Sequence, residues 1–231
     1  MPIINLYAIA IDPRNPILFA IAGSDEYARV YDIRNYRWDG TTNRGRPTDC
    51  FCPTHLIGDR QVGITGLAFS EQSELLASYN DELIYLFTKD QGMGPNPIGW
   101  YLGSTMDRIS EDSKTRPEPQ VYRGHRNCDT LKGVSFFGPN CDYVVSGSDC
   151  GRIFIWRRRD GELLQVIAGD KCVVNCVEPH PSATMLASSG IENDIKIWTP
   201  NAVEPSRPVN MDEVICSVLV LFFFSLCSLS S

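Results

Sequence analysis

Apolar and polar positions alternate in short stretches along this chain, and each stretch follows an apolar run and a small polar turn. Two such units end in tryptophan, at residues 144–156 and 186–198. Alternation over about four to eight residues is typical of a β-strand with one buried face, and small polar residues between two runs are typical of tight turns. The pattern therefore predicts strand–turn–strand units rather than helices.

The unit recurs at a spacing that indicates a repeat architecture. The aromatic residues at its equivalent position, separated by 56, 69 and 42 residues, are Tyr31, Phe87, Trp156 and Trp198. A period of about 40–45 residues is typical of the four-stranded blades of β-propellers. We therefore predict an all-β domain over residues 1–200 with about four blades, at 3–36, 62–90, 122–168 and 172–200.

Each predicted blade contains three or four strands. We expect them at 6–11, 17–22 and 28–31; at 66–69, 75–78 and 83–87; at 133–136, 143–146, 152–156 and 163–168; and at 173–177, 185–188 and 194–198. Two insertions, 35–57 and 88–121, account for the wider gaps, and we expect both to be long surface loops.

Composition limits the classes of function. The chain has 231 residues, of which 43% are hydrophobic and 21% charged, and its formal net charge is −7. Such a chain is globular, and it lacks the basic footprint of a nucleic-acid-binding protein, so nucleic acid is not an expected partner.

The nine cysteines have no regular spacing, and the first residues lack a basic signal-peptide region. We expect free thiols and a location in the nucleus or the cytoplasm, or both.

No combination of side chains indicates catalysis. The three histidines lie in no nucleophile–base, metal-triad or phosphate-loop pattern, so we expect no enzyme activity, no cofactor and no small-molecule substrate. Cys50, Cys52 and His55 have a short spacing that suits zinc, but a closed zinc site needs four ligands and no second pair lies nearby. We therefore favour incidental loop residues over a metal site.

The repeats resemble the WD-repeat family, in which Gly-His opens a blade and an acidic residue lies six positions before the aromatic. Gly124 and His125 match the opening of the third blade. The resemblance implies a hydrogen-bonded network inside the blades, formed by His125, Ser146, Asp149, Trp156, Asp25, Asp81 and Trp198. The third blade departs from the pattern because Cys150 holds the acidic position and Asp149 precedes it.

Two turns resemble a motif in substrate receptors of cullin-4 ubiquitin ligases. These receptors often carry Trp-Asp-x-Arg after the third strand, where the arginine contacts the adaptor, damaged-DNA-binding protein 1. Residues 31–34 match with tyrosine in place of tryptophan, and residues 156–159 keep the tryptophan and the arginine but lose the aspartate. The resemblance implies adaptor contacts by Tyr31, Asp32, Arg34 and Arg159. The alternative is that both arginines are ordinary solvated turn charges.

A narrower resemblance extends over three of the four blades. Residues 121–127, 133–139, 146–151 and 175–181 are similar to the DDB1- and cullin-4-associated factor 8 group. This resemblance implies a non-catalytic receptor that acts in the ubiquitin conjugation pathway, with the ligase adaptor and ubiquitination substrates as partners. A general WD-repeat scaffold without a ligase is the second interpretation. Nothing in the sequence identifies the substrates.

The ends of the chain suggest a truncated form. Relatives in the WD-repeat family typically have seven blades, so we expect these four to be the C-terminal part of a larger propeller, with closure of four blades as the alternative.

The tail, 201–231, is apolar from 214, but its apolar run of 13 residues is shorter than the roughly 20 that cross a bilayer. A membrane-tethered propeller is therefore the least favoured interpretation. Because the residues from Val214 onward can be encoded by pyrimidine-rich codons, we hypothesise that this segment is translated from a retained intron that begins after Glu213. An ordinary coding exon at that locus would reject the hypothesis.

Overall fold

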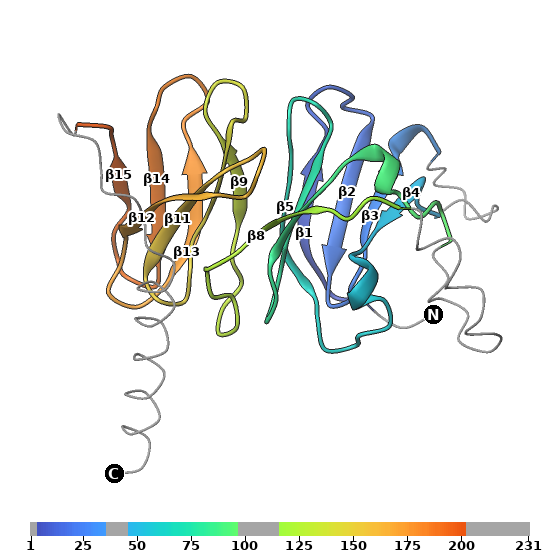
Figure 1. Ribbon diagram of the computed structural model, residues 1–231, viewed down its shortest axis with the longest axis horizontal. Helices are drawn as coiled ribbons and strands as arrows, with labels where there is room; N and C mark the ends of the chain where they lie inside the picture. Colours follow the sequence, from blue (N-terminus) through green and yellow to red (C-terminus); the bar gives the residue numbers. More distant parts are fainter. Residues whose placement is uncertain (1–3, 36–45, 97–115, 202–231) are drawn as a thin grey trace, which may run out of the picture. The chain divides into compact units, whose positions relative to one another are not determined.

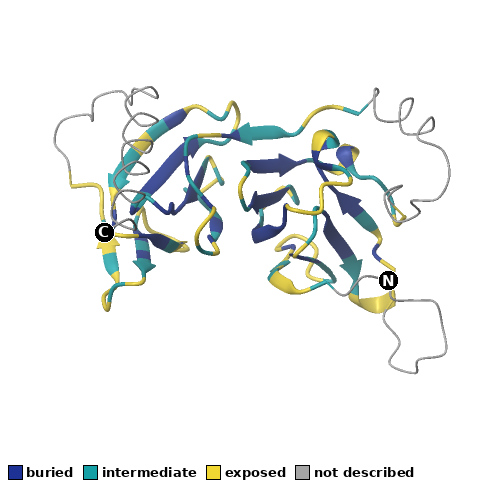
Figure 2. Ribbon diagram, turned by 90° about the horizontal axis from the view of Figure 1, so that it is seen from below, coloured by how far each residue is buried: buried dark blue, intermediate teal, exposed yellow. Residues whose placement is uncertain are grey.

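The computed structural model describes residues 4–35, 46–96 and 116–201, which form antiparallel strands joined by turns and three short 3-10 helices (Figure 1). The predicted all-β fold is confirmed. The chain divides into two units, Met1–Val121 and Tyr122–Ser231. Buried residues lie along the strands and most exposed ones at the turns (Figure 2). Within the described ranges, no helix has the length and apolar character needed to cross a bilayer.

Two four-stranded sheets make up the first unit. One has the order β1 (Leu6–Ile11), β2 (Leu18–Gly23), β3 (Ala28–Asp32) and β4 (Asp49–Phe51). The other has the order β5 (Ile64–Phe69), β6 (Leu75–Tyr79), β7 (Ile84–Phe87) and β8 (Gln120–Tyr122), whose last residue begins the second unit. The 3-10 helices are η1 (Ile33–Asn35), η2 (Thr54–Leu56) and η3 (Lys89–Gln91).

The prediction that the two insertions are loops throughout is wrong. Residues 49–51 form β4 and residues 120–122 form β8, so each insertion contributes residues to the fourth strand of its sheet. Cys50 and Cys52 are consequently core residues rather than incidental loop residues, with relative exposures of 0% and 7%. The parts of the insertions at 36–45 and 97–115 lie outside the described residues.

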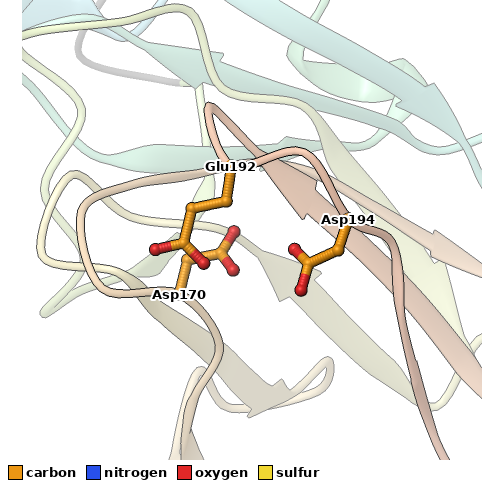
Figure 3. Close-up of side chains that lie close together, drawn as sticks. All are labelled: Asp170, Glu192 and Asp194. Atoms are coloured by element: carbon orange, nitrogen blue, oxygen red, sulfur yellow. The ribbon is translucent and has the colours of Figure 1, made fainter.

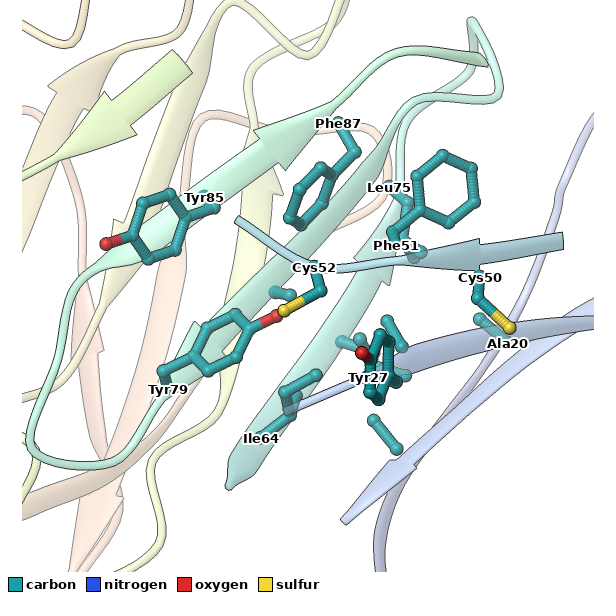
Figure 4. Close-up of a cluster of buried hydrophobic side chains, with 14 of the residues drawn as sticks. Ala20, Tyr27, Cys50, Phe51, Cys52, Ile64, Leu75, Tyr79, Tyr85 and Phe87 are labelled. Atoms are coloured by element: carbon teal, nitrogen blue, oxygen red, sulfur yellow. The ribbon is translucent and has the colours of Figure 1, made fainter. Parts of the chain in front are cut away.

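Small side chains allow the two sheets of the first unit to approach closely. One face of the first sheet presents Ala20, Ala22 and Ala28, all fully buried, and strands β1 and β2 of this sheet contact β5 of the second. Larger side chains fill the rest of this core, and several of them are shown in Figure 4: Tyr27, Phe51, Ile64, Tyr79 and Phe87. Burial of this apolar surface is the main term that stabilises the unit.

A four-stranded and a three-stranded sheet form the second unit. The first has the order β9 (Val134–Phe137), β10 (Tyr143–Ser146), β11 (Arg152–Arg157) and β12 (Leu163–Ala168). The second has the order β13 (Val174–Pro179), β14 (Leu186–Gly190) and β15 (Lys196–Trp198). The strands lie within about two residues of the predicted positions.

Glycine is required where these two sheets approach each other. A Cβ atom at Gly147 would lie 2.1 Å from the carbonyl oxygen of Val174. Because real Cβ atoms do not come so close to backbone, any side chain here would push β13 away. The adjoining core contains Val145, Ile153 and Leu186, all less than 5% exposed.

Candidate functional site

The turn after β3 holds Arg34 in a defined orientation at the surface. Asp32 ends the strand, and its Oδ1 accepts a hydrogen bond from the backbone N–H of Arg34 at 2.9 Å. The guanidinium folds back on the same carboxylate, with Nε donating to Oδ1 at 3.0 Å and Nη2 to Oδ2 at 2.6 Å. These hydrogen bonds lower the pKa of Asp32 and raise that of Arg34. The Arg34 side chain nevertheless remains 68% exposed.

Tyr31 supports this turn from within the sheet. Its ring stacks on Phe19 of the adjacent strand, with ring centroids 5.6 Å apart and planes 19° apart. The residue is half-buried, and this burial raises the pKa of its phenol. The aromatic position of the predicted motif therefore belongs to the blade, while the arginine is accessible to a partner.

Arg159 lies in the turn between β11 and β12 and is held less firmly. Its Nε donates to Asp160 Oδ2 at 3.2 Å, and its side chain is 77% exposed. Arg157 competes for the same carboxylate oxygen, at 3.1 Å, and also pairs with Glu162. Without an aspartate at position 157, Arg159 lacks the two-pronged pairing that orients Arg34.

The hydrogen bonds predicted for His125 are not present. Both of its ring nitrogens are buried without a hydrogen-bond partner among the described residues. The ring instead meets Trp156 edge to face, with centroids 5.8 Å apart. Burial lowers the pKa of His125 to about 4, so the imidazole is neutral at physiological pH. The predicted hydrogen bonds of His125 are therefore wrong. Trp156, the third of its expected partners, does contact it, but through ring packing rather than a hydrogen bond.

The two tryptophans use different acceptors. Trp156 Nε1 donates to the backbone carbonyl of Arg123 at 2.8 Å, whereas Trp198 Nε1 donates to Ser188 Oγ at 2.9 Å. Ser146 in turn donates to the backbone carbonyls of Gly133 and Gly147, at 3.0 Å and 3.1 Å. The fourth blade thus has a hydrogen bond from tryptophan to serine, whereas in the third blade both the tryptophan and the serine donate to backbone carbonyls.

Lys132 is the partner of Asp149 that the sequence did not indicate. The two side chains form a fully buried ion pair. Asp149 also accepts hydrogen bonds from the backbone N–H groups of Cys128 and Asp129, at 2.6 Å and 2.9 Å. These bonds and the lysine outweigh the effect of burial and lower the pKa of Asp149. Lys132 also reaches Asn175 Oδ1 at 3.1 Å, so the network joins the two sheets of this unit.

The acidic turn positions of the first two blades differ from each other. Asp25 forms an ion pair with Arg29, which is only 3% exposed. Asp81 is exposed and adopts a left-handed conformation, with φ of 55°, and Asn80 Nδ2 approaches its carboxylate at 3.4 Å. The structure thus gives Asp81 no part in a buried network. Its neighbour Glu82 accepts the hydroxyl of Tyr85 instead, at 2.9 Å.

Two side-chain clusters bear on metal binding. Asp170, Glu192 and Asp194 bring carboxylate oxygens within 4.8 Å of one another (Figure 3). Lys196 places its ammonium among them, at 2.8 Å from Asp194 and 3.4 Å from Glu192 and paired with Asp170, so a cation of the chain already balances this cluster.

The cysteines singled out for zinc are buried thiols. Burial raises the pKa of Cys50 to about 12, which disfavours the thiolate that zinc requires. His55 points its Nε2 at the hydroxyl of Tyr85, at 3.1 Å. Cys50, Cys52 and His55 do not converge on a common point among the described residues.

Comparisons with known proteins agree with the repeat structure. Residues 117–157 and 161–199 match the family described as "WD domain, G-beta repeat". The chain is also similar to a solved structure, "Crystal structure of the computationally designed Ika4 protein", with a TM-score of 0.54 and 17% identity over 86% of this chain and 92% of that one. At this identity the likeness concerns the fold alone.

Curated relatives are similar over about half of the chain. "DDB1- and CUL4-associated factor 6" from Homo sapiens is 54% identical over 99 residues, which cover 41% of this chain and 11% of that protein. "Protein ALTERED SEED GERMINATION 2" from Arabidopsis thaliana is 49% identical over 110 residues, 45% of this chain and 14% of that protein. "WD and tetratricopeptide repeats protein 1" from Homo sapiens is 41% identical over 127 residues, 50% and 19% of the two chains.

These relatives confirm the resemblance at the level of the group, while the narrower resemblance to factor 8 stays a prediction. The matched segment is a small part of each relative, so their full activities do not transfer directly. The chain contains WD40 repeats at residues 117–157 and 161–199, has an all-β fold of antiparallel sheets, and is homologous, over part of its length, to DDB1- and CUL4-associated factor 6.

Proposed function

We propose that this protein is a non-catalytic scaffold that serves as a substrate receptor of a cullin-4 ubiquitin ligase and docks on the adaptor DDB1 through the turn after β3. The name of the relative with 54% identity associates that protein with DDB1 and CUL4. The observation that carries the proposal here is the exposed, carboxylate-oriented guanidinium of Arg34.

Orientation by Asp32 makes Arg34 suitable for a protein interface. A guanidinium has five N–H donors in a rigid plane, and Asp32 engages only the side that carries Nε and Nη2. Among the described residues no other acceptor engages the guanidinium, so its remaining donors can meet acceptors of a partner. Since the side chain is already held in place, its docking loses less conformational entropy than that of a free arginine.

Arg159 is proposed as a second, weaker contact. It is more exposed than Arg34, and among the described residues its side chain hydrogen-bonds to Asp160 alone. A side chain held by one contact loses more conformational entropy on docking than one held by a two-pronged pairing, so the contribution of Arg159 should be smaller. We further propose that the substrates are proteins and that the receptor acts in the nucleus or the cytoplasm.

Co-purification of the adaptor tests the proposal. We expect Arg34→Ala to recover at least about tenfold less DDB1 than the wild type, which corresponds to about 1.4 kcal/mol. Arg34→Lys is the matched control, since it keeps the charge but cannot form the planar two-pronged contact, and it should also bind weakly. Arg159→Ala should show a smaller loss.

Equal recovery of DDB1 by wild type and Arg34→Ala would remove Arg34 from the mechanism. If neither DDB1 nor cullin-4 co-purifies with the wild type while other proteins do, the general-scaffold interpretation replaces the receptor. The similarity to a WD and tetratricopeptide repeats protein, whose name mentions no ligase, is the observation that favours this second function.

A further inference from the structure

A pocket in the first unit lies at one end of its strands. It has a volume of about 420 Å³, within the range of roughly 300–1,000 Å³ typical of ligand pockets. The starts of β2 and β6 contribute Leu18 and Leu75, and the ends of β5 and β7 contribute Phe69 and Phe87. Val30, in the middle of β3, also lines the pocket. The pocket therefore has apolar walls built on strands of both sheets.

Aromatic rings form part of these walls. Phe51 and Phe87 lie with their ring centroids 5.6 Å apart, and Figure 4 shows Leu75 beside them. The faces of aromatic rings attract planar cations such as guanidinium, and they pack well against the methylene groups of a long cationic side chain. The walls alone would accept many apolar groups, so the polar groups in the pocket decide its specificity.

Asp12 supplies a buried carboxylate. The residue is only 1% exposed, and its Oδ1 accepts three hydrogen bonds, from the backbone N–H groups of Arg14 and Asn15 at 2.9 Å and 3.3 Å and from Ser73 Oγ at 3.1 Å. Within the described part of the chain no hydrogen bond reaches its Oδ2. A carboxylate oxygen can accept hydrogen bonds, and one from a charged donor is among the stronger kinds, so a cationic ligand in the pocket can pair with this oxygen.

Asp49 repeats this arrangement on the same pocket. Its Oδ1 accepts the backbone N–H groups of Cys50 and Gly94, at 2.9 Å and 2.7 Å, and no hydrogen bond from the described residues reaches its Oδ2. In both aspartates Oδ1 accepts the hydrogen bonds that hold the local backbone, and no described residue donates to Oδ2. Lys89, which is exposed, is the one lysine or arginine among the described lining residues, so the two carboxylates outnumber it.

We propose that this pocket binds an arginine side chain of a peptide partner. The guanidinium pairs with the free oxygens of Asp12 and Asp49, and its stem packs on Phe51 and Phe87. Arginine fits better than lysine because its planar group can both donate to two carboxylates and stack on a ring. This site does not depend on docking of the adaptor through Arg34.

Binding of a short peptide to the full chain tests the site. The probe is the tripeptide acetyl-Gly-Arg-Gly-amide, and its neutral counterpart replaces arginine by citrulline. Isothermal titration should show at least about tenfold tighter binding of the arginine peptide. Asp12→Asn keeps the oxygen that caps the turn and should weaken binding of the arginine peptide by a similar factor. Asp49→Asn gives the same test if Asp12→Asn fails to fold.

Two further variants distinguish an arginine site from an anion pocket and from the adaptor contact. Lys89→Ala removes the competing cation and should tighten binding of the arginine peptide about two- to threefold, whereas a pocket for anions would bind it no better. Arg34→Ala should leave the affinity unchanged, so a failure of adaptor docking and a failure of this site are distinguishable. Equal affinities for the arginine and citrulline peptides, or for the wild type and both asparagine variants, would overturn the proposal.

Discussion

His125 is a titratable side chain enclosed by the third blade. Its ring packs edge to face with Trp156 and has no hydrogen-bond partner among the described residues. The charges nearest to it act in opposite directions, since Asp149 raises its pKa and Lys132 lowers it, but burial is the largest effect. The fold therefore holds the imidazole neutral and makes its protonation unfavourable.

Stability should consequently fall in mild acid. In the unfolded chain the imidazole binds a proton at about pH 6.5, whereas in the folded chain its pKa is about 4. Between these values the unfolded state binds more protons, so the free energy of unfolding decreases as the pH is lowered, by up to about 3 kcal/mol at pH 4. Urea denaturation at several pH values between 7 and 4 measures this decrease.

His125→Phe is the control for this pH dependence. It keeps an aromatic ring against Trp156 but has no group that titrates, so its stability should depend less on pH between 6.5 and 4. The two proteins are compared by the slope of the free energy of unfolding against pH. The absolute free energy of unfolding is not compared, because the phenylalanine ring is larger than the imidazole and changes it independently of pH. Identical slopes for the two proteins would show that His125 is not the group responsible.

Sequence reasoning identified the residues of the third blade but not their bonds. The repeat pattern brought His125, Ser146, Asp149 and Trp156 together, and all four are buried. Their partners include backbone carbonyls, which carry no sequence signal, and Lys132, which appears in the sequence as an ordinary surface charge. Pairing in a core depends on distances across strands, and spacing along the chain does not give those distances.

At the scale of elements, β4 is the clearest difference between prediction and structure. It has three residues, Asp49–Phe51, and lies within the insertion at 35–57. So short a strand cannot show an alternating pattern, and its cysteine and aromatic residues also suit a loop. Longer strands such as β11 and β12 were predicted almost to the residue because six positions suffice to show which side chains face inward.

Phe51→Ala should therefore be strongly destabilising. The side chain is 6% exposed and packs on Phe87, so its removal leaves a cavity in the first unit. Truncation of a buried phenylalanine typically costs about 3–5 kcal/mol, whereas an exposed loop residue costs less than about 0.5 kcal/mol. Ile33→Ala is the matched control in the same unit, since Ile33 is 58% exposed. Chemical denaturation measures both, and equal losses would contradict the assignment of 49–51 to the core.

On the scale of the whole molecule, both units leave apolar side chains exposed on a terminal sheet. In the first unit, Ile9 and Ile11 of β1 are 68% and 62% exposed. In the second unit, Ile195 is 71% exposed and lies just before β15, and Ile197 is 63% exposed and lies within it. The sheets of a propeller are normally covered on both faces by their neighbours, so such side chains favour association with another surface.

We expect the chain to self-associate at increasing concentration and the double variant Ile9→Lys/Ile195→Lys to do so less. Burial of one isoleucine contributes about 1.5–3 kcal/mol, so two lysines should raise the concentration at which half of the chains associate by at least tenfold. Because both positions are exposed, the change should alter the free energy of unfolding by less than about 0.5 kcal/mol per site. Leu131→Lys is the control, since Leu131 is 52% exposed but lies outside the strands. Sedimentation velocity over a concentration series compares the three proteins, and unchanged association of the double variant would place the contact elsewhere.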